Sequence, residues 1–374
     1  MLDKRKINLL LFFFLFALVG VGYMILNPFI NHPKFYQDSL MIVNSSRDIS
    51  IGAGSYKTTS FLLAPITDSL DLIGANIYSY GQRYDLGFFF TNGVYMILFL
   101  IPMMYIWMKK MPKLNVINVF CFLVMFGLYS AFYGVPNKDF IPFVFSFISL
   151  LFYFKGFKKT SILLLVVLMS YYAALGRFYY ALFAVCLILH LTIKRKSVLF
   201  ILYGIGIALC YVMFNTSVFQ YIYLARPSNN IDITNTWIDY PLNDHVFSGF
   251  ILNRVLELVR LFFPVELLIK SVNYIPFVVF QLVTTVVTFK VLRNKKDYNP
   301  LEVVSALVVL TFTISQAIFE PDFGSYFRHK ISIFPFIYIL IRSHEYNFKF
   351  LRKKSPEKKK AKKGIRIFRK RIVW

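Results

Sequence analysis

The sequence predicts an all-helical, polytopic integral membrane protein with about ten transmembrane helices. Apolar residues make up 57% of the 374 residues, and the mean hydropathy is +0.60. Soluble globular chains contain only about 45–50% apolar residues. Many of the apolar residues also form runs of up to about 20, the length that crosses about 30 Å of hydrocarbon. Short basic turns separate several of these runs, as is typical of the loops between transmembrane helices.

Ten apolar runs are predicted to span the membrane. The run 7–27 follows a short basic segment, but it is too long for a signal-peptide core and no small-residue cleavage site follows. We therefore expect it to be an uncleaved first span. The other predicted spans are 87–108, 115–133, 140–154, 160–176, 178–193, 197–214, 274–292, 300–319 and 331–342. Residues 248–260 alternate apolar and polar positions with helical spacing, which predicts an amphipathic helix on the membrane surface.

Charged residues divide unevenly between the two sides that these spans define. One side holds 30 of the 42 Lys and Arg but five of the 18 acidic residues. Positive charge marks the cytoplasmic side, so both termini are predicted to be cytoplasmic. Two large loops, 31–86 and 215–273, then lie on the outer side. We expect one membrane domain, residues 1–348, and a basic cytoplasmic tail, residues 349–374, that binds the anionic inner leaflet rather than nucleic acid.

Several enzyme classes are disfavoured because their motifs are missing from the sequence. It contains no P-loop, dinucleotide-binding fingerprint, His-Glu-x-x-His motif, Gly-x-Ser-x-Gly elbow or Asp-x-Asp pair. The three cysteines lie in apolar runs, which favours small core residues over a disulfide framework or a metal site. We therefore expect chemistry without ATP, a nucleotide, a metal or another cofactor.

Ionisable residues at the outer ends of the spans are the first candidates for function, because charged groups at membrane depth are costly. The turn between the third and fourth spans contains Asn137, Lys138 and Asp139. Arg177 lies in the turn between the fifth and sixth spans, and Tyr180 follows it. An ordinary hairpin turn also explains the first pattern, and a side chain that reaches to the membrane surface also explains Arg177.

The densest cluster of ionisable residues is the segment 320–330, between the last two predicted spans. It places acidic and basic side chains within one short turn, namely Glu320, Asp322, Arg328, His329 and Lys330. The second outer loop adds further charges, among them Arg254. Turn formation is the alternative role for the segment 320–330, and surface solvation is the alternative for the loop residues.

Taken together, these clusters predict a site for a lipid-linked substrate at the outer membrane surface. Arg and Lys side chains suit an anionic group such as a pyrophosphate, and they stabilise it electrostatically as a leaving group. Carboxylates and a His suit the deprotonation of an acceptor hydroxyl. The many Tyr and Phe residues suit stacking on sugar rings.

Four short patterns carry a family resemblance. They are the segment Tyr84-Asp85-Leu86-Gly87-Phe88 ahead of the second span, the turn 137–139, Arg177, and the element Gly324-Ser325-x-x-Arg328-His329. They resemble the aromatic-acid-x-Gly-Phe segment, the Lys-Asp turn and the outer arginine sites of Wzy-type and EpsG-like bacterial surface polysaccharide polymerases. Together with the long second outer loop, the resemblance extends over roughly residues 80 to 340.

The resemblance implies a GT-C-like, metal-independent glycosyltransferase of the bacterial inner or plasma membrane. Such an enzyme joins undecaprenyl-pyrophosphate-linked repeat units into an O-antigen, a capsule or an exopolysaccharide, with a chain-length regulator and a flippase as partners. The catalytic candidates are Asp139, His329 and Glu320, and the substrate-binding candidates are Arg177, Arg328, Lys138, Arg254, Asp322 and Tyr180.

Two other functions stay open at this point. The first is a membrane O-acyltransferase that modifies surface glycans, although its usual His and Arg motif near the first helix has only His32 to match it. The second is a flippase or transporter for the same lipid-linked glycan. Transporters tend to place charges at the membrane midplane and to contain paired repeats, whereas the charges of this chain cluster at the outer ends of the spans.

Overall fold

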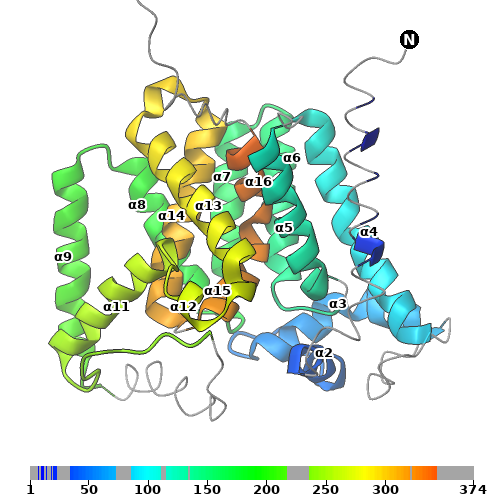
Figure 1. Cartoon of the computed structure of the whole chain (residues 1–374). Coiled ribbons are helices and arrows are strands. Elements are labelled where there is room, and N and C mark those ends of the chain that lie inside the picture. The colour runs from blue at the N-terminus through cyan, green and yellow to red at the C-terminus, as the bar shows by residue number, and fades with distance from the viewer. Residues whose placement is uncertain are drawn as a thin grey trace, which may run out of the picture. The chain divides into compact units, whose positions relative to one another are not determined.

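The part of the chain that the computed structural model describes is built almost entirely of α-helices (Figure 1). It comprises residues 34–72, 86–110, 115–133, 135–216, 236–320 and 322–342, with a few helical residues between 7 and 22. Within it, the one strand-like pairing is an isolated bridge between Trp237 and Asp322. Most of the first predicted span, Tyr84 and Asp85, and the basic tail 349–374 lie outside the described residues.

The helices follow the apolar runs closely. The long helices are α2 (Lys34–Asn44), α3 (Ser55–Leu72), α4 (Leu86–Lys109), α5 (Val116–Tyr133), α6 (Phe140–Phe154), α7 (Lys158–Ala174), α8 (Tyr179–Thr192), α9 (Lys196–Met213), α11 (Phe247–Phe262), α13 (Ile275–Arg293) and α14 (Pro300–Phe319). The short ones are α12 (Leu267–Lys270), α15 (Phe323–His329), α16 (Phe334–Arg342), η3 (Val272–Tyr274), η4 (Lys295–Asp297) and η5 (Lys330–Ile333). The second to tenth predicted spans each coincide with a helix to within three residues at either end.

Several of these helices have the character of membrane spans. Among the described residues, four segments are long and apolar enough to cross a membrane, namely Phe90–Lys109, Lys196–Met213, Val272–Arg293 and Pro300–Phe319. Three further apolar helices, Val116–Gly127, Phe140–Phe154 and Tyr179–Thr192, are shorter. The chain is therefore all-helical with apolar helices that suggest a membrane protein. The count of about ten spans stays a prediction.

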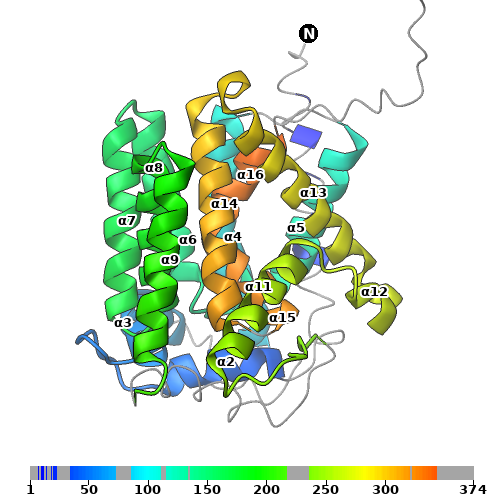
Figure 2. The same ribbon diagram turned by 90° about the vertical axis from the view of Figure 1, so that its left-hand side faces the viewer.

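Helix α14 lies at the centre of the bundle, where it contacts α8, α11, α13 and α16 (Figure 2). Small polar residues join neighbouring helices through buried hydrogen bonds. The Ser149 hydroxyl donates to the carbonyl of Ser161 at 2.8 Å, and the Ser161 hydroxyl returns a bond to the Ser149 carbonyl at 2.7 Å, which links α6 to α7. Such residues let membrane helices approach closely while their polar groups stay satisfied.

Helix α9 lies at the edge of the bundle and contains no buried residue (Figure 1). It exposes large apolar side chains such as Phe200, Ile201 and Val212. A hydrogen bond of 3.0 Å between His190 and Tyr203 ties it to α8. A continuous exposed apolar surface of this kind marks an interaction surface, and contact with lipid explains it most simply.

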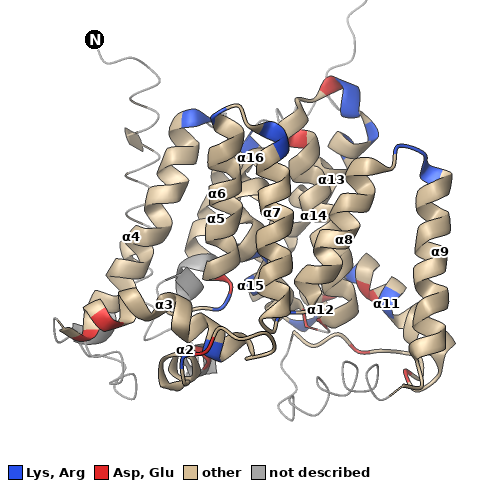
Figure 3. Ribbon diagram, turned by 180° about the vertical axis from the view of Figure 1, so that it is seen from behind, with Lys and Arg blue, Asp and Glu red and all other residues tan. Residues whose placement is uncertain are grey.

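The two ends of the bundle differ in charge (Figure 3). One end, which we call the basic end, carries the turns Lys109–Lys110, Lys155–Lys159, Lys194–Lys196 and Arg293–Lys296. The opposite ends of α6, α8 and α14 carry Asp139, Arg177 and Glu320, and we call this the mixed-charge end. All the turns with candidate functional residues therefore meet at one end of the bundle.

Part of the first large loop packs across the mixed-charge end as α2 and α3. The Ser39 hydroxyl donates to the Pro136 carbonyl at 2.9 Å, and the Gly54 amide donates to the Leu175 carbonyl at 3.1 Å. Gly176 has a φ of +133°, and a Cβ there would lie 2.7 Å from the Cα of Gly54. Glycine at position 176 thus allows the close approach that docks this segment beside Arg177.

Candidate functional site

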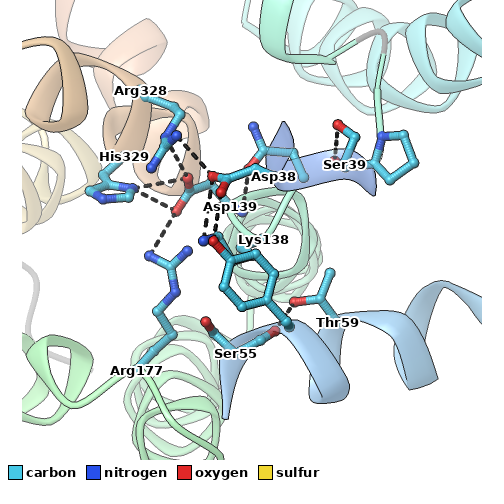
Figure 4. A network of polar contacts seen from close by, with 12 residues as sticks. Asp38, Ser39, Ser55, Thr59, Lys138, Asp139, Arg177, Arg328 and His329 are labelled. Carbon is cyan, nitrogen blue, oxygen red and sulfur yellow. Dashed lines mark hydrogen bonds and ion pairs between the residues drawn. The ribbon is translucent and has the colours of Figure 1, made fainter. Parts of the chain in front are cut away.

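Asp139 is the centre of a buried polar network at the mixed-charge end (Figure 4). Its fully buried carboxylate accepts hydrogen bonds from Nδ1 of His329 at 2.9 and 3.0 Å. It lies 3.7 Å from Nη1 of Arg177 and 3.8 Å from Nε of Arg328. Burial raises the pKa of Asp139, but the neighbouring His329 and Arg177 outweigh burial and hold that pKa below its usual range. The network therefore surrounds an ionised carboxylate.

His329 bridges two carboxylates. Its Nδ1 contacts Asp139, and its Nε2 lies 3.3 Å from Oε2 of Glu320. The ring packs against the ring of Tyr179, with 5.5 Å between the centroids. The ring therefore lies between two acidic side chains, with a hydrogen bond to Asp139 and a longer contact to Glu320. The three catalytic candidates thus form one row along which a proton can move.

Local capping chemistry positions the end of this row. The Asp322 carboxylate accepts hydrogen bonds from the amides of Gly324 at 3.2 Å and Ser325 at 3.0 Å, as an N-cap residue does. Helix α15 begins there, and its last turn presents Arg328 and His329. The structure thus places Asp322 as the cap of α15, and its role as a substrate-binding residue stays a prediction.

Two arginines approach Asp139 from different segments, and each keeps a buried donor. Nη1 of Arg177 donates to the hydroxyl of Tyr179 at 2.5 Å, while its Nη2 is buried without a hydrogen-bond partner among the described residues. Nη1 of Arg328 donates to Asp38 at 3.0 Å, while its Nε also lacks a hydrogen-bond partner in the described part of the chain. Both guanidinium groups thus retain the capacity to bind a further acceptor.

Two members of the network, Asp38 and Tyr56, come from the first loop, where the sequence indicated no function. Oδ2 of Asp38 lies 3.4 Å from Nζ of Lys138, and the Tyr56 hydroxyl donates to Oδ1 of Asp38 at 2.6 Å. Burial opposes the charge on Asp38, but Arg328 and Lys138 hold its pKa well below the usual range. The one sequence feature that could have indicated Asp38 is that it is the single acidic residue of the amphipathic segment Lys34–Asn44.

Lys138 completes the ring of cationic groups. Its Nζ lies 3.8 Å from the centroid of the Tyr56 ring, which is a cation–π contact. Burial and the neighbouring Arg177 lower the pKa of Lys138 to about 7. The charge of this side chain therefore changes near neutral pH.

Arg254 lies outside this network, in a separate cluster on α11. Its Nη1 donates to Glu257 at 2.9 Å and to the Tyr240 hydroxyl, and its Nη2 donates to Asp244 at 3.2 Å. Burial raises the pKa of Glu257 to about 8. These contacts hold the segment before α11 against the helix. Its Nε is buried without a hydrogen-bond partner among the described residues, so the contact of Arg254 with a pyrophosphate stays a prediction.

Tyr180 lies near Asp139 and Arg177, but its hydrogen bond and ring contacts are with other side chains. Its side chain is fully buried, its hydroxyl forms a hydrogen bond with that of Ser332, and its ring packs against those of Tyr179 and Tyr172. These contacts join α8 to η5. The structure therefore places Tyr180 in the packing next to the network, and its contact with substrate stays a prediction.

The network can bind an anion and move a proton. Arg177, Arg328 and Lys138 supply positive charge and hydrogen-bond donors, and the row from Asp139 to Glu320 supplies acid–base groups. Within the described ranges, no group of three or more His, Cys, Asp or Glu side chains is arranged to hold a metal ion. Metal-independent chemistry stays a prediction.

Comparisons with known proteins add no relative to this picture. No family model, no curated protein and no solved structure matches the chain significantly. The likeness to polysaccharide polymerases therefore rests on short sequence patterns and predicted spans. The contacts within the network are an independent observation, since they involve segments far apart in the sequence.

Proposed function

We propose that the chain is a bacterial surface polysaccharide polymerase of the Wzy type, with about ten spans and a GT-C-like arrangement. It joins undecaprenyl-pyrophosphate-linked repeat units at the outer face of the inner or plasma membrane. The observation that carries the proposal is the convergence of three cationic side chains at the mixed-charge end, where Arg177 and Arg328 lie beside Asp139 and Lys138 pairs with Asp38. With positive charge marking the cytoplasm, this end faces outward.

The cationic groups suit the leaving group of this reaction. When the bond between the anomeric carbon and the pyrophosphate breaks, the electron pair stays on the phosphate oxygen, where negative charge develops. The unused donors on Arg177 and Arg328 bind that oxygen in a site from which water is largely excluded. One such preorganised donor contributes about 10²–10³-fold to a rate in known enzymes.

The row of Asp139, His329 and Glu320 suits the acceptor. The hydroxyl of the second glycan attacks the anomeric carbon, and its proton passes to Glu320. Asp139 is fully buried, whereas the side chain of Glu320 is 11% exposed, so Glu320 is the more accessible of these two carboxylates. His329 lies between the two and stabilises the charge on both.

A deletion strain complemented with variants tests the proposal. Without the protein, we expect lipid-linked single repeat units and no long polymer. Wild type and Arg260→Ala should restore long chains, because Arg260 lies on α11 outside the network, paired with Glu266. Arg328→Ala and Glu320→Gln should not restore them. Long polymer in the deletion strain would refute the proposal.

Two outcomes of the same experiment separate the other functions. Polymer of normal length that lacks an acyl group would favour an O-acyltransferase. Repeat units retained at the cytoplasmic face would favour a flippase. A reporter fused in the turn that precedes α15 adds a test of topology, since the proposal requires this turn to lie outside the cytoplasm.

A further inference from the structure

A partly exposed carboxylate from the first loop pairs with two of the cationic groups. Oδ2 of Asp38, on α2, accepts a hydrogen bond from Nη1 of Arg328 at 3.0 Å and lies 3.4 Å from Nζ of Lys138 (Figure 4). Its Oδ1 accepts a hydrogen bond from the hydroxyl of Tyr56 at 2.6 Å. Three donors thus converge on its two oxygens. A phosphate group at the same position would accept hydrogen bonds from the same three donors.

The two carboxylates of the network differ in access. Asp139 is completely buried, whereas the side chain of Asp38 is 29% exposed. Arg328, which contacts both, is itself 25% exposed. Of the two carboxylates, Asp38 is therefore the one that an anion from outside the bundle can approach. While Asp38 is in place, its Oδ2 holds Nη1 of Arg328.

The balance of charges also favours replacement of Asp38 by the pyrophosphate over the presence of both at the site. Arg177, Arg328 and Lys138 offer up to three positive charges to the two carboxylates Asp38 and Asp139. A pyrophosphate carries at least two negative charges, so its entry beside both carboxylates leaves an excess of negative charge. If Asp38 leaves as the phosphate enters, the cations stay paired throughout, and the unused donors on Arg177 and Arg328 gain acceptors.

We propose that Asp38 is an internal occupant of the phosphate position, and that the incoming pyrophosphate group displaces it. The inference rests on the proposed function for the identity of the ligand, a lipid-linked pyrophosphate. In this view the segment formed by α2 and α3 covers the site until an anion replaces its carboxylate. The anchors at Ser39 and Gly54 hold the segment in place, so the exchange needs only the Asp38 side chain to turn away.

Ligand binding to the purified full-length protein tests this inference. Binding of inorganic pyrophosphate and of farnesyl pyrophosphate is measured in detergent micelles by calorimetry. Asp38→Asn removes the competing charge with almost no change in shape. If the site is open in at most a tenth of wild-type molecules, the variant binds both ligands at least about tenfold more tightly. Arg328→Gln should abolish binding.

Matched controls make the direction of the change informative. Asp68→Asn lies in the same segment, in an exposed pair with Arg47, and should leave binding unchanged. Asp38→Ala removes the whole carboxylate but keeps all three donors, so it should also tighten binding and provides a second test if Asp38→Asn folds poorly. Unchanged or weaker binding in Asp38→Asn and Asp38→Ala would overturn the inference.

The outcomes also separate this inference from the proposed function. If Asp38→Asn binds more tightly but the deletion strain still makes long polymer, the anion site stands and the polymerase proposal fails. If polymer depends on Arg328 but Asp38→Asn does not bind more tightly, the polymerase proposal stands and the displacement fails. Farnesyl pyrophosphate that binds no better than inorganic pyrophosphate would point to a free phosphate compound and overturn the lipid-linked ligand.

Discussion

Replacing Asp139 with Asn tests whether this carboxylate holds the network together. The change keeps the shape of the side chain but removes the negative charge that Arg177 and Arg328 share. The carboxylate lies 3.7 and 3.8 Å from the two guanidinium groups and is fully buried. At these distances and an effective dielectric constant of about 20, each pair attracts by about 4 kcal/mol before solvation costs.

The net loss of stability is smaller than the sum of these attractions. In the variant, Arg328 still pairs with Asp38 and stays partly exposed to solvent. Removing one partner of a buried ion pair typically costs about 3–5 kcal/mol, since it leaves a buried charge without compensation. We therefore expect the free energy of unfolding to fall by about this amount in Asp139→Asn, and long-chain polymer to disappear.

The assay is titration of the purified protein with SDS in mixed micelles, with helix content as the signal. Asp68→Asn is the matched control, because it also neutralises an aspartate paired with an arginine, but one exposed to solvent. Its unfolding curve should overlay that of the wild type. A loss of less than about 1 kcal/mol in Asp139→Asn would refute a role of this charge in holding the arginines.

Three further predictions follow from individual contacts. Gly176→Ala should lower the free energy of unfolding by about 1–3 kcal/mol in the same titration, because φ is +133° and the new Cβ meets Gly54. Tyr180→Phe should cost only about 0.5–1.5 kcal/mol, from the lost bond to Ser332, and leave polymer length unchanged. The lowered pKa of Lys138, about 7, means that its charge is present below pH 7 and lost above it. Pyrophosphate affinity, measured by calorimetry, should therefore fall between pH 6 and 8, and Lys138→Gln should flatten this dependence.

The bounds of the helices were largely predictable because they depend on local sequence. Apolar runs end where basic or polar turns begin, and each such change of composition lies within a few residues of a helix end. The expected helix 140–154 coincides with α6 for this reason. The number of spans is harder to predict, since α6 and α8 contain only 15 and 14 residues. Such lengths are short for crossing about 30 Å of hydrocarbon.

The network was predictable in part because its charges interrupt apolar sequence. Asp139 and Arg177 stand in short turns between apolar runs, and His329 lies in the densest run of ionisable residues, which singles them out. The same reasoning missed the capping role of Asp322, since it did not weigh local hydrogen bonds to the backbone. Asp is a common N-cap residue because its carboxylate accepts hydrogen bonds from the backbone amides two and three positions later. The structure shows these bonds from the amides of Gly324 and Ser325 to Asp322.

The contribution of Asp38 was not predictable, because its partners are remote in the sequence. It is separated from Arg328 by 290 positions, and no local pattern links the two. Their contact depends on how α2 and α3 dock, and this in turn depends on the close approach of Gly54 and Gly176. A substitution at Gly176 should therefore weaken the hold on Asp38 as well as the fold. Gly176→Ala would then raise the affinity for pyrophosphate while it lowers the free energy of unfolding. A general disruption of the site would instead lower both.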